Sequence, residues 1–347
     1  MTFKYLLFAA QPYAYEILRP LQTAIRKRGD DVAWFLEPSA GDGLRADEIR
    51  LPDVDAVNAF APDAVFVPGN IVPDFFPGLK VQVFHGFGIE KKGHFRIRGW
   101  FDLYCTHGPL TTRPFEELAR RHRHFAVRET GWPKMDALFE SADEQWRNVF
   151  DDDSKPLVLY APTFSPSLTS APALFEQIRA LASSGEWNWL VKFHPKMDRH
   201  WIRQFEAAEN AHLRVAQTTD IAGLLRAADV LLSDTSSVIA EFLLLDKPAV
   251  TFRNSRPGPH LVDFSRATEL ESRLRHALAL TPDDREAARA FARAMHPCTD
   301  GRSSERVLDA VEDFIRSNGQ AGLTRKPLNL WRRLRMRRKY RRLMTRR

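Results

Sequence analysis

The feature that most constrains the fold is a repeated unit, in which an apolar run of strand length ends in a turn and a helical pattern follows. The first run spans residues 3–10, and the pattern over 12–28 predicts a helix that ends before Gly29. Further runs of the same kind lie at 31–36, 63–69, 80–86 and 102–108. Strand-length runs that alternate with helices predict an α/β fold with a parallel sheet.

A polar and acidic stretch at 140–156 interrupts this pattern, and we predict a domain boundary there. The apolar runs then resume at 157–162, 187–195, 213–216, 229–234 and 248–252. Helical patterns lie at 172–184, 198–209, 220–227 and 236–245, and two more lie near 282–294 and 303–317. The pattern in each half of the chain therefore predicts a Rossmann-like domain with a doubly wound sheet. We expect the two domains to face one another across a cleft. Ligands of such sheets bind beyond the carboxyl ends of the strands.

The expected organisation is a first domain over 1–145, a second over 155–300, a helix over 301–320 and a basic segment over 325–347. That segment holds 12 of the 51 Lys and Arg residues and no acidic residue, so 39 basic and 44 acidic side chains remain elsewhere. The net charge of +7 therefore resides in the end of the chain. An acidic body without a helix-turn-helix or RNP-like motif argues against a nucleic-acid-binding protein.

The basic segment interleaves its charges with Leu330, Trp331, Leu334 and Tyr340. This pattern is typical of a helix that binds a membrane surface, and we predict an anionic membrane as its partner. Nucleic-acid binding and a disordered, solvated tail are the alternatives. No apolar run approaches the ~18 residues of a membrane span, so we expect a peripheral protein.

The predicted location is the cytoplasmic face of the membrane. The apolar run near the start of the chain has the length of a first buried strand, and we do not expect it to be a signal peptide. Cys105 and Cys298 are the two cysteines of the chain, which is too few for a disulfide framework or a cysteine-rich zinc site. A reducing compartment is the natural inference.

Candidate chemistry begins with His85, which is followed by Gly86, Phe87 and Gly88 at the end of the run 80–86. Lys91 and Lys92 come shortly after it. A histidine at the carboxyl end of a strand can act as a general base near neutral pH. The alternative is a half-exposed loop histidine beside solvated lysines.

Further candidates follow the strands of the second half. Thr163 comes after the strand 157–162 and could donate to a phosphate, although a plain turn hydroxyl is the simpler interpretation. Lys192 and His194 alternate on one face of a strand end, where their side chains suit an anionic group. A structural histidine stacked on Pro195 is the alternative.

The richest segment is Ser233-Asp234-Thr235-Ser236-Ser237, where an apolar strand leads into a helix. The free N–H groups and the dipole of a helix start favour a phosphate, and Glu241 one turn later could accept from a polyol hydroxyl. An ordinary N-cap is the alternative. A similar start lies at Arg302, Ser303 and Ser304, where the spacing favours a cap and Arg302 could also reach a phosphate.

Together and in this order, the motifs resemble those of the CDP-glycerol glycerophosphotransferase family, the teichoic acid primases and polymerases. The resemblance spans about residues 80–317 and rests on short segments at 85–93, 130–136, 160–163, 194–195, 233–237, 246–248 and 300–306. It implies a GT-B-like pair of Rossmann domains and a transferase that uses a CDP-activated polyol. Two departures are Thr235, where the family commonly has an aromatic residue, and Lys192, where it often has arginine.

The resemblance assigns roles to these residues. His85 would be the base, with Gly86 beside it, and His194, Ser236 and Ser237 would hold the diphosphate. Arg302, Ser303 and Ser304 would complete the phosphate side. In the expected reaction an acceptor hydroxyl loses its proton to His85 and attacks the β-phosphorus, and CMP leaves.

We therefore predict a transferase that moves glycerol phosphate or a similar polyol phosphate to a hydroxyl of a lipid-linked cell-surface glycan or polymer. A nucleotide-sugar glycosyltransferase or a UDP-sugar 2-epimerase-like enzyme of the same architecture is the alternative. No Asp-x-Asp motif suits a divalent metal, and Asp151-Asp152-Asp153 has the character of a solvated charge run. We expect no cofactor and no tightly held metal.

Overall fold

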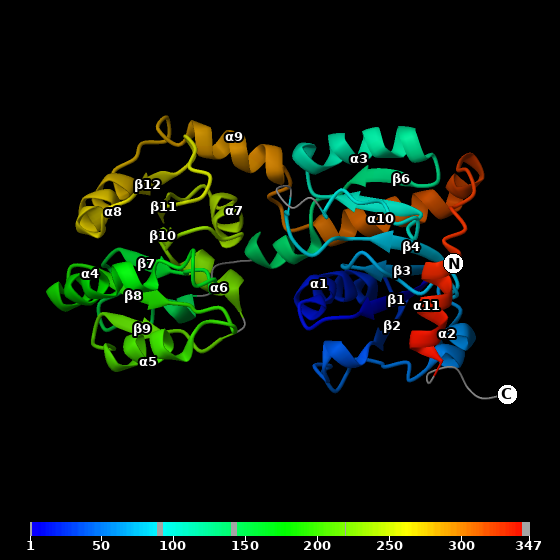
Figure 1. Ribbon diagram of the computed structural model, residues 1–347, viewed down its shortest axis with the longest axis horizontal. Coiled ribbons are helices and arrows are strands. Elements are labelled where there is room, and N and C mark those ends of the chain that lie inside the picture. Colours follow the sequence, from blue (N-terminus) through cyan, green and yellow to red (C-terminus); the bar gives the residue numbers. More distant parts are fainter. Residues whose placement is uncertain (1, 89–92, 140–143, 219, 342–347) are drawn as a thin grey trace. The chain divides into compact units, whose positions relative to one another are not determined.

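The computed structural model describes residues 2–88, 93–139, 144–218 and 220–341, and it consists of two units (Figure 1). Contacts between residues group Met1–Phe139 with Ala294–Arg347 as unit 1, and Glu140–Arg293 form unit 2. Residues 294–300, expected in the second domain, thus belong to unit 1. The reason is α10 (Ser303–Arg316), which buries Val307, Leu308 and Val311 and contacts a helix and a strand of unit 1.

The sheet of unit 1 has six parallel strands in the order β2-β1-β3-β4-β5-β6. Their bounds are β1 (Lys4–Ala9), β2 (Asp31–Leu36), β3 (Ala64–Val67), β4 (Leu79–Gln82), β5 (Leu103–Thr106) and β6 (Ala126–Glu129). The helices are α1 (Ala14–Lys27), α2 (Val54–Phe60), α3 (Pro109–His122), α10 and α11 (Leu330–Tyr340). The strand order reverses between β1 and β3, and the carboxyl ends of strands at such a point form a ligand crevice in doubly wound sheets.

The sheet of unit 2 is also parallel, in the order β12-β11-β10-β7-β8-β9. Its strands are β7 (Leu157–Tyr160), β8 (Asn188–Val191), β9 (Leu213–Val215), β10 (Val230–Ser233), β11 (Ala249–Phe252) and β12 (Val262–Phe264). The helices are α4 (Ala171–Ser184), α5 (Arg199–Ala207), α6 (Ile221–Ala227), α7 (Val238–Leu243) and α8 (Leu270–Leu278), and α9 (Glu286–Met295) belongs to this unit up to Arg293. The strand order reverses here between β7 and β10.

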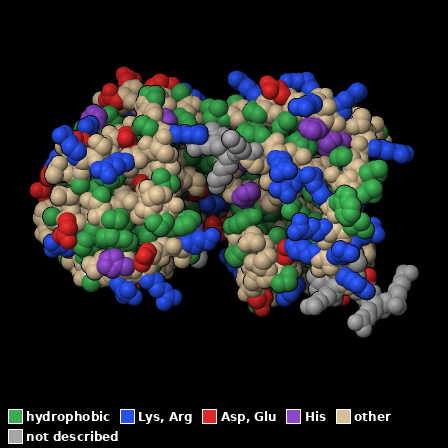
Figure 2. Space-filling model, viewed as in Figure 1, with side chains coloured by type: hydrophobic (Ala, Val, Ile, Leu, Met, Phe, Trp, Pro, Cys, Tyr) green, Lys and Arg blue, Asp and Glu red, His purple; other side chains and the backbone are tan. Residues whose placement is uncertain are grey.

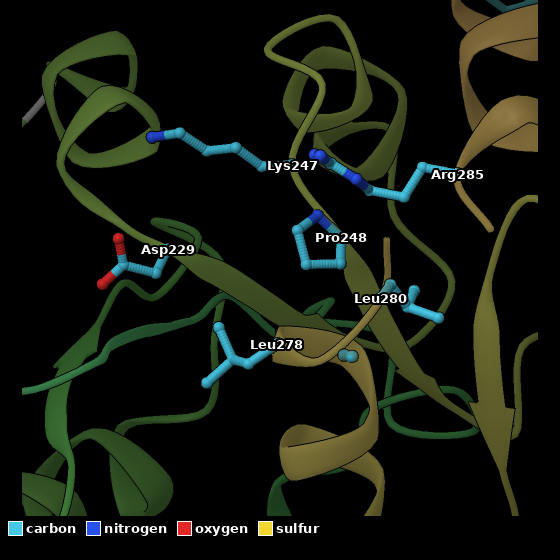
Figure 3. Close-up of a pocket in the computed structure, with 7 residues that line it drawn as sticks. Asp229, Lys247, Pro248, Leu278, Leu280 and Arg285 are labelled. Carbon is cyan, nitrogen blue, oxygen red and sulfur yellow. The ribbon is translucent and has the colours of Figure 1, made fainter. Parts of the chain in front are cut away.

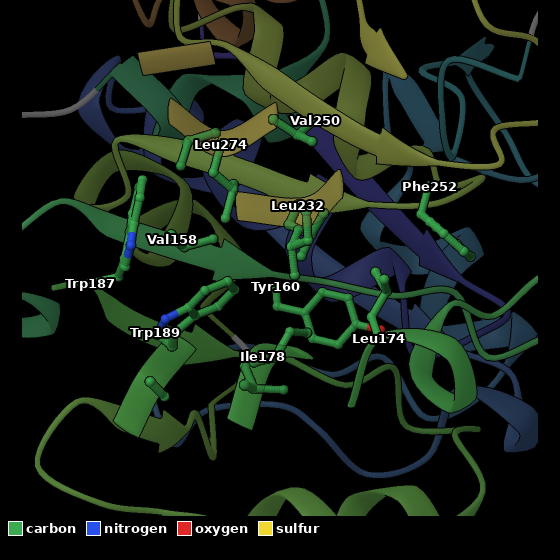
Figure 4. Packing of buried hydrophobic residues seen from close by; sticks show 14 of the residues in the cluster. Val158, Tyr160, Leu174, Ile178, Trp187, Trp189, Leu232, Val250, Phe252 and Leu274 are labelled. Carbon is green, nitrogen blue, oxygen red and sulfur yellow. The ribbon is translucent and has the colours of Figure 1, made fainter. Parts of the chain in front are cut away.

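Continuous apolar strands explain the buried cores, because a parallel sheet covered by helices buries both faces of each strand. In unit 2, Val158, Tyr160 and Trp189 lie against Leu174 and Ile178 of α4 (Figure 4). Burying a side chain of this size contributes about 1.5–3 kcal/mol to stability. The core of unit 1 is rich in aromatic residues from β1, β2 and the loops that follow β3 and β4.

The basic segment is partly folded onto unit 1, which the sequence pattern does not reveal. Met336 and Tyr340 of α11 are buried in the aromatic core of that unit. The Tyr340 hydroxyl donates to Glu37, and Lys326 pairs with Asp102 at 2.7 Å. Within the described part of the chain, no helix has the length and apolar character needed to cross a membrane.

Candidate functional site

His85 lies just beyond the carboxyl end of β4, on a loop with an unusual backbone. Phe84, the residue before it, has a φ of 59°, and Gly86 after it has a φ of 158°. A left-handed conformation at a non-glycine residue costs of the order of 1–3 kcal/mol and persists only where packing enforces it. The buried Phe84 ring supplies that packing, with centroids 5.1 Å from both His107 and Phe115. The side chain of His85 itself is exposed.

The hydrogen bond of His85 identifies its tautomer. Its Nδ1 lies 3.1 Å from the carbonyl oxygen of Pro68, in the loop after β3. Because a carbonyl oxygen can only accept, Nδ1 must carry the proton in this bond, and Nε2 of the neutral ring keeps its lone pair. The ring of Tyr13, after β1, is stacked on the imidazole at a centroid distance of 5.3 Å. The sequence carries only a weak signal for Tyr13, an aromatic residue that follows a strand.

His194 lies beyond the carboxyl end of β8 in unit 2, and its contacts define the opposite tautomer. Its Nδ1 accepts from the backbone N–H of Lys196 at 3.1 Å, so the proton of the neutral ring is on Nε2. Burial lowers the pKa of His194, and the charges of Lys196 and Lys192 lower it further. The imidazole is stacked on Phe164 at 4.4 Å, which places the loop after β7 against the loop after β8.

Asp234 has a structural role that differs from the expected contact with a phosphate. Its buried carboxylate accepts from the backbone N–H groups of Thr163 at 2.9 Å and Thr235 at 2.7 Å. It also accepts from the N–H and hydroxyl of Ser170, both at 2.9 Å. Burial raises the pKa of Asp234, and these hydrogen bonds act in the opposite direction. The carboxylate therefore joins the loops after β7 and β10.

The neighbours of Asp234 divide into buried and accessible groups. Ser233 is buried and its hydroxyl donates to the carbonyl of Ala161 at 2.7 Å, while the Thr235 hydroxyl accepts from Ser255 N–H at 3.0 Å. Ser237 is exposed, and its side chain makes no capping bond with α7. Ser236 is half-buried with its hydroxyl 3.4 Å from Val238 N, and Glu241 is buried. Burial removes Glu241 from the expected contact with a polyol hydroxyl.

The expected phosphate residues Arg302, Ser303 and Ser304 lie at the start of α10, in unit 1. The carboxylate of Asp136 accepts from the backbone N–H groups of Ser303 and Ser304, both at 2.7 Å, and both serines are buried. Arg302 pairs with Glu305 at 2.6 Å. The anion at this helix start is therefore a side chain of the chain itself, and the cap interpretation describes these residues better than the phosphate interpretation.

The motif around Asp136 fits the same structural role. A Cβ at Gly131 would lie 2.5 Å from the Ser303 hydroxyl, so only glycine fits there. The backbone N–H of Trp132 donates to Nε2 of His296 at 2.8 Å. Burial is the main cause that lowers the pKa of His296 to about 4, so the ring is a neutral acceptor at physiological pH. Residues 130–136 and 296–304 thus hold one another inside unit 1.

The segment Asp246-Lys247-Pro248 lies before β11, at the amino edge of the unit 2 sheet. Asp246 pairs with Arg289 at 2.7 Å, and Lys247 donates to the carbonyl oxygens of Arg226 and Ala228 beside the end of α6. Burial lowers the pKa of Lys247 to about 8. A pocket opens here between Asp229, Lys247 and Arg285 (Figure 3). These charges support the fold, on the edge opposite to the one that carries His194.

Two expectations from the sequence remain, one about the two lysines that follow His85 and one about a metal site. Lys91 and Lys92 lie outside the described residues. Among the residues with described positions, no three His, Cys, Asp or Glu side chains gather as a metal site would require.

Comparison with known proteins decides between the enzyme classes left open by the sequence. The model of the CDP-Glycerol:Poly(glycerophosphate) glycerophosphotransferase family matches residues 100–313. The chain belongs to this family. The predicted enzyme class, which transfers a polyol phosphate from a CDP-activated donor, is thereby confirmed. The match includes Thr163, Lys192, His194 and the segment 233–237, and it begins after His85.

Two teichoic acid primases with similar sequences agree with this family assignment. The teichoic acid glycerol-phosphate primase of Bacillus subtilis is 23% identical over 263 residues, which are 68% of each chain. The teichoic acid ribitol-phosphate primase of Bacillus spizizenii is 23% identical over 303 residues, which are 74% of this chain and 75% of the primase.

Solved structures show the same fold. The wall teichoic acid polymerase TagF has a TM-score of 0.67 at 14% identity, with coverage of 90% of this chain and 89% of the polymerase chain. A putative UDP-N-acetylglucosamine 2-epimerase from Listeria monocytogenes has a TM-score of 0.66 at 15% identity, with coverage of 91% and 98%. These likenesses confirm the predicted GT-B-like pair of α/β domains. The family match, and not the shared fold, separates this glycerophosphotransferase from the epimerases.

Proposed function

We propose that this glycerophosphotransferase family member moves glycerol phosphate or a related polyol phosphate from its CDP-activated donor to a hydroxyl of a lipid-linked teichoic-acid-type polymer. The named relatives support the polymer class, since both are teichoic acid primases. One observation carries the assignment of roles. The two histidines at carboxyl edges of the sheets have opposite tautomers, as their hydrogen bonds to the Pro68 carbonyl and the Lys196 N–H require.

The tautomers divide the chemistry between the histidines. A general base needs an unprotonated nitrogen within reach of the acceptor hydroxyl, and His85 presents the lone pair of Nε2. A group that binds the donor diphosphate needs a proton to donate, and His194 presents Nε2–H. The lowered pKa of His194 supports this role, because a neutral ring keeps Nδ1 as the acceptor for Lys196 N–H.

The proposed reaction follows from these roles. Nε2 of His85 takes the proton of the acceptor hydroxyl while the oxygen forms a bond to the β-phosphorus. The bond between that phosphorus and the oxygen bridging to the α-phosphorus breaks, and CMP leaves with the electron pair. His194, Lys192 and the hydroxyls of Ser236 and Ser237 stabilise the negative charge on the phosphoryl oxygens and on CMP.

The remaining predicted residues take supporting places in this proposal. Thr163 keeps its hydroxyl as a donor to phosphate, while its N–H is bonded to Asp234. Gly86 provides the positive φ that turns the chain after His85. Ser233, Asp234, Glu241, Arg302, Ser303 and Ser304 are left out of the proposed donor site because they are buried or bonded within the fold.

The donor is tested by CMP release from the purified 347-residue chain with a membrane-lipid acceptor in detergent. We expect turnover with CDP-glycerol or CDP-ribitol, and none with UDP-GlcNAc or GDP-mannose. The double variant Lys192→Ala/His194→Ala should raise the donor KM and lower kcat, because both groups bind the diphosphate. Matched substitution of exposed Arg199 and His200 of α5 is the control. Release of UDP or GDP would contradict the proposal.

We further propose that α11 and its approach bind the anionic cytoplasmic face of the membrane, where a lipid-linked acceptor resides. The side chains of Leu328, Leu330, Trp331 and Leu334 are exposed, and Trp331 is 86% exposed. Exposed Arg335, Arg337 and Arg338 lie among them. Hydrophobic and basic side chains occur together over this region (Figure 2). Each basic side chain near an anionic surface contributes about 1 kcal/mol to binding.

Vesicle binding tests this surface without disturbing the fold. The variant Trp331→Ser/Leu334→Ser should weaken binding to phosphatidylglycerol-containing vesicles by about tenfold or more, since two large apolar side chains no longer enter the lipid. Ile49→Ser, which changes an apolar residue of unit 1 with 62% exposure, should bind like the wild type. Activity on a soluble acceptor should not change. Equal sedimentation of both variants with the vesicles would contradict this proposal.

A further inference from the structure

Tyr13 is placed to act on His85. It follows β1 and directly precedes α1, so it belongs to the loop at the point where the strand order of unit 1 reverses. Its ring lies nearly parallel to the His85 imidazole, at 27° and with 5.3 Å between centroids. Tyr13 is 40% exposed, and its side chain is not among the buried residues of the core.

The surroundings of His85 give this contact its importance. The histidine is exposed, and Gly86 and Gly88 follow it with φ values of 158° and 39°. One hydrogen bond, from Nδ1 to the Pro68 carbonyl, defines which nitrogen is the base. A flip of the ring would break that bond and exchange the position of Nδ1 with a carbon. An aromatic ring stacked on the imidazole fixes its plane, because a partly rotated imidazole loses the flat contact and no longer directs Nδ1–H at the Pro68 carbonyl.

We propose that Tyr13 is a positioning residue for His85, whose ring holds the imidazole with Nδ1–H on the Pro68 carbonyl and Nε2 available as the base. The inference rests on the proposed role of His85. The ring, and not the hydroxyl, performs this function. Burial raises the pKa of Tyr13, so its hydroxyl stays neutral wherever the enzyme is assayed near neutral pH.

Kinetics of four variants test the proposal: Tyr13→Ala, Tyr13→Phe, His85→Ala and the double variant Tyr13→Ala/His85→Ala. Tyr13→Ala should lower kcat by about tenfold or more and leave the donor KM within about twofold, because a misplaced base loses reaction rate and not donor binding. Tyr13→Phe keeps the ring and should restore nearly full kcat. In the His85→Ala background, Tyr13→Ala should have little further effect, since the group on which it acts is gone.

A spectroscopic readout is independent of turnover. In long-range ¹H–¹⁵N spectra of histidine-labelled protein, His85 should be the Nδ1–H tautomer in the wild type and in Tyr13→Phe. In Tyr13→Ala it should become a mixture of tautomers. Tyr13→Leu, which retains apolar volume, replaces the alanine variant if that protein fails to fold, and the same loss of kcat is expected.

Several results would overturn the inference. An unchanged kcat with a raised KM in Tyr13→Ala would make Tyr13 a substrate-binding residue. An equal loss in the wild-type and His85→Ala backgrounds would show that it acts independently of His85. If His85→Ala itself kept full kcat, the proposed base would be refuted, and that outcome is distinct from a failure confined to Tyr13.

Discussion

Replacing His85 by alanine is expected to lower kcat for CMP release by about 10²–10⁴-fold, the usual contribution of a general base. The donor KM should change little, because in the proposed reaction His85 contacts the acceptor hydroxyl and not the diphosphate. The measurement is steady-state CMP release with CDP-glycerol at saturating acceptor. His85→Gln should be no better than alanine, since an amide cannot take up the proton.

His122→Ala is the matched control, because it removes an exposed histidine of the same unit at the end of α3. Its kcat should equal that of the wild type. If His85→Ala lost only a few-fold in kcat, the proton would have to go to another group, and the tautomer argument for His85 would no longer assign the base. Thermal unfolding of each variant separates a loss of chemistry from a loss of structure.

Asp234→Ala is expected to destabilise unit 2 by about 3 kcal/mol or more. The substitution leaves the buried N–H of Ser170 without its acceptor, which costs about 1–3 kcal/mol, and the part-buried N–H groups of Thr163 and Thr235 lose theirs as well. Asp234→Asn should destabilise unit 2 nearly as much. One carboxylate oxygen becomes an N–H₂ group, which cannot accept from the N–H or hydroxyl donors on that side. Urea unfolding, with hydrogen exchange of peptides from β7 and β10 to locate the loss, is the measurement.

The control for Asp234 is Asp198→Ala, which removes an exposed aspartate of unit 2 that caps α5 through a single bond to His200 N–H. Loss of such a cap costs about 1 kcal/mol. A different result would return Asp234 to the donor site. If Asp234→Ala unfolded at the wild-type urea concentration and only raised the donor KM, the carboxylate would bind ligand and would not join the loops.

Periodicity predicts the interior of each sheet better than its edges. Strands such as β1, β3 and β10 are continuous apolar runs, because they are buried on both faces. Two of the four edge strands, β6 and β12, are short and half-exposed, so their sequences lack that signal. The positions of His85 and His194 were predictable as well, since both follow apolar strands and the carboxyl ends of parallel strands share one edge.

The roles within the motifs were harder to predict, because the same residue types suit a ligand and a fold. The Ser, Asp and Thr residues after β10 would suit a phosphate site, and they suit a structural role equally well. In the structure Asp234 accepts from Ser170, which lies 64 positions away. The acceptor for the N–H of Ser303 is 167 positions distant, at Asp136. No local pattern reports such pairs. The ring contact of Tyr13 with His85 is equally non-local and follows only from the order of the strands.

The docking of α11 has a consequence for any lipid surface that the enzyme binds. A membrane anchor on a flexible linker leaves a catalytic domain free to tumble above the bilayer. Here Tyr340 and Met336, near the end of α11, are buried in the core of unit 1. At the start of the helix, the side-chain amide of Asn329 donates to the carbonyl oxygen of Arg98 at 2.9 Å. A bilayer that binds Trp331 would therefore set the tilt of the unit 1 sheet and the height of His85 above the lipid. Lipid-linked acceptors of one particular length would then bring their hydroxyl to His85 more often than shorter or longer acceptors.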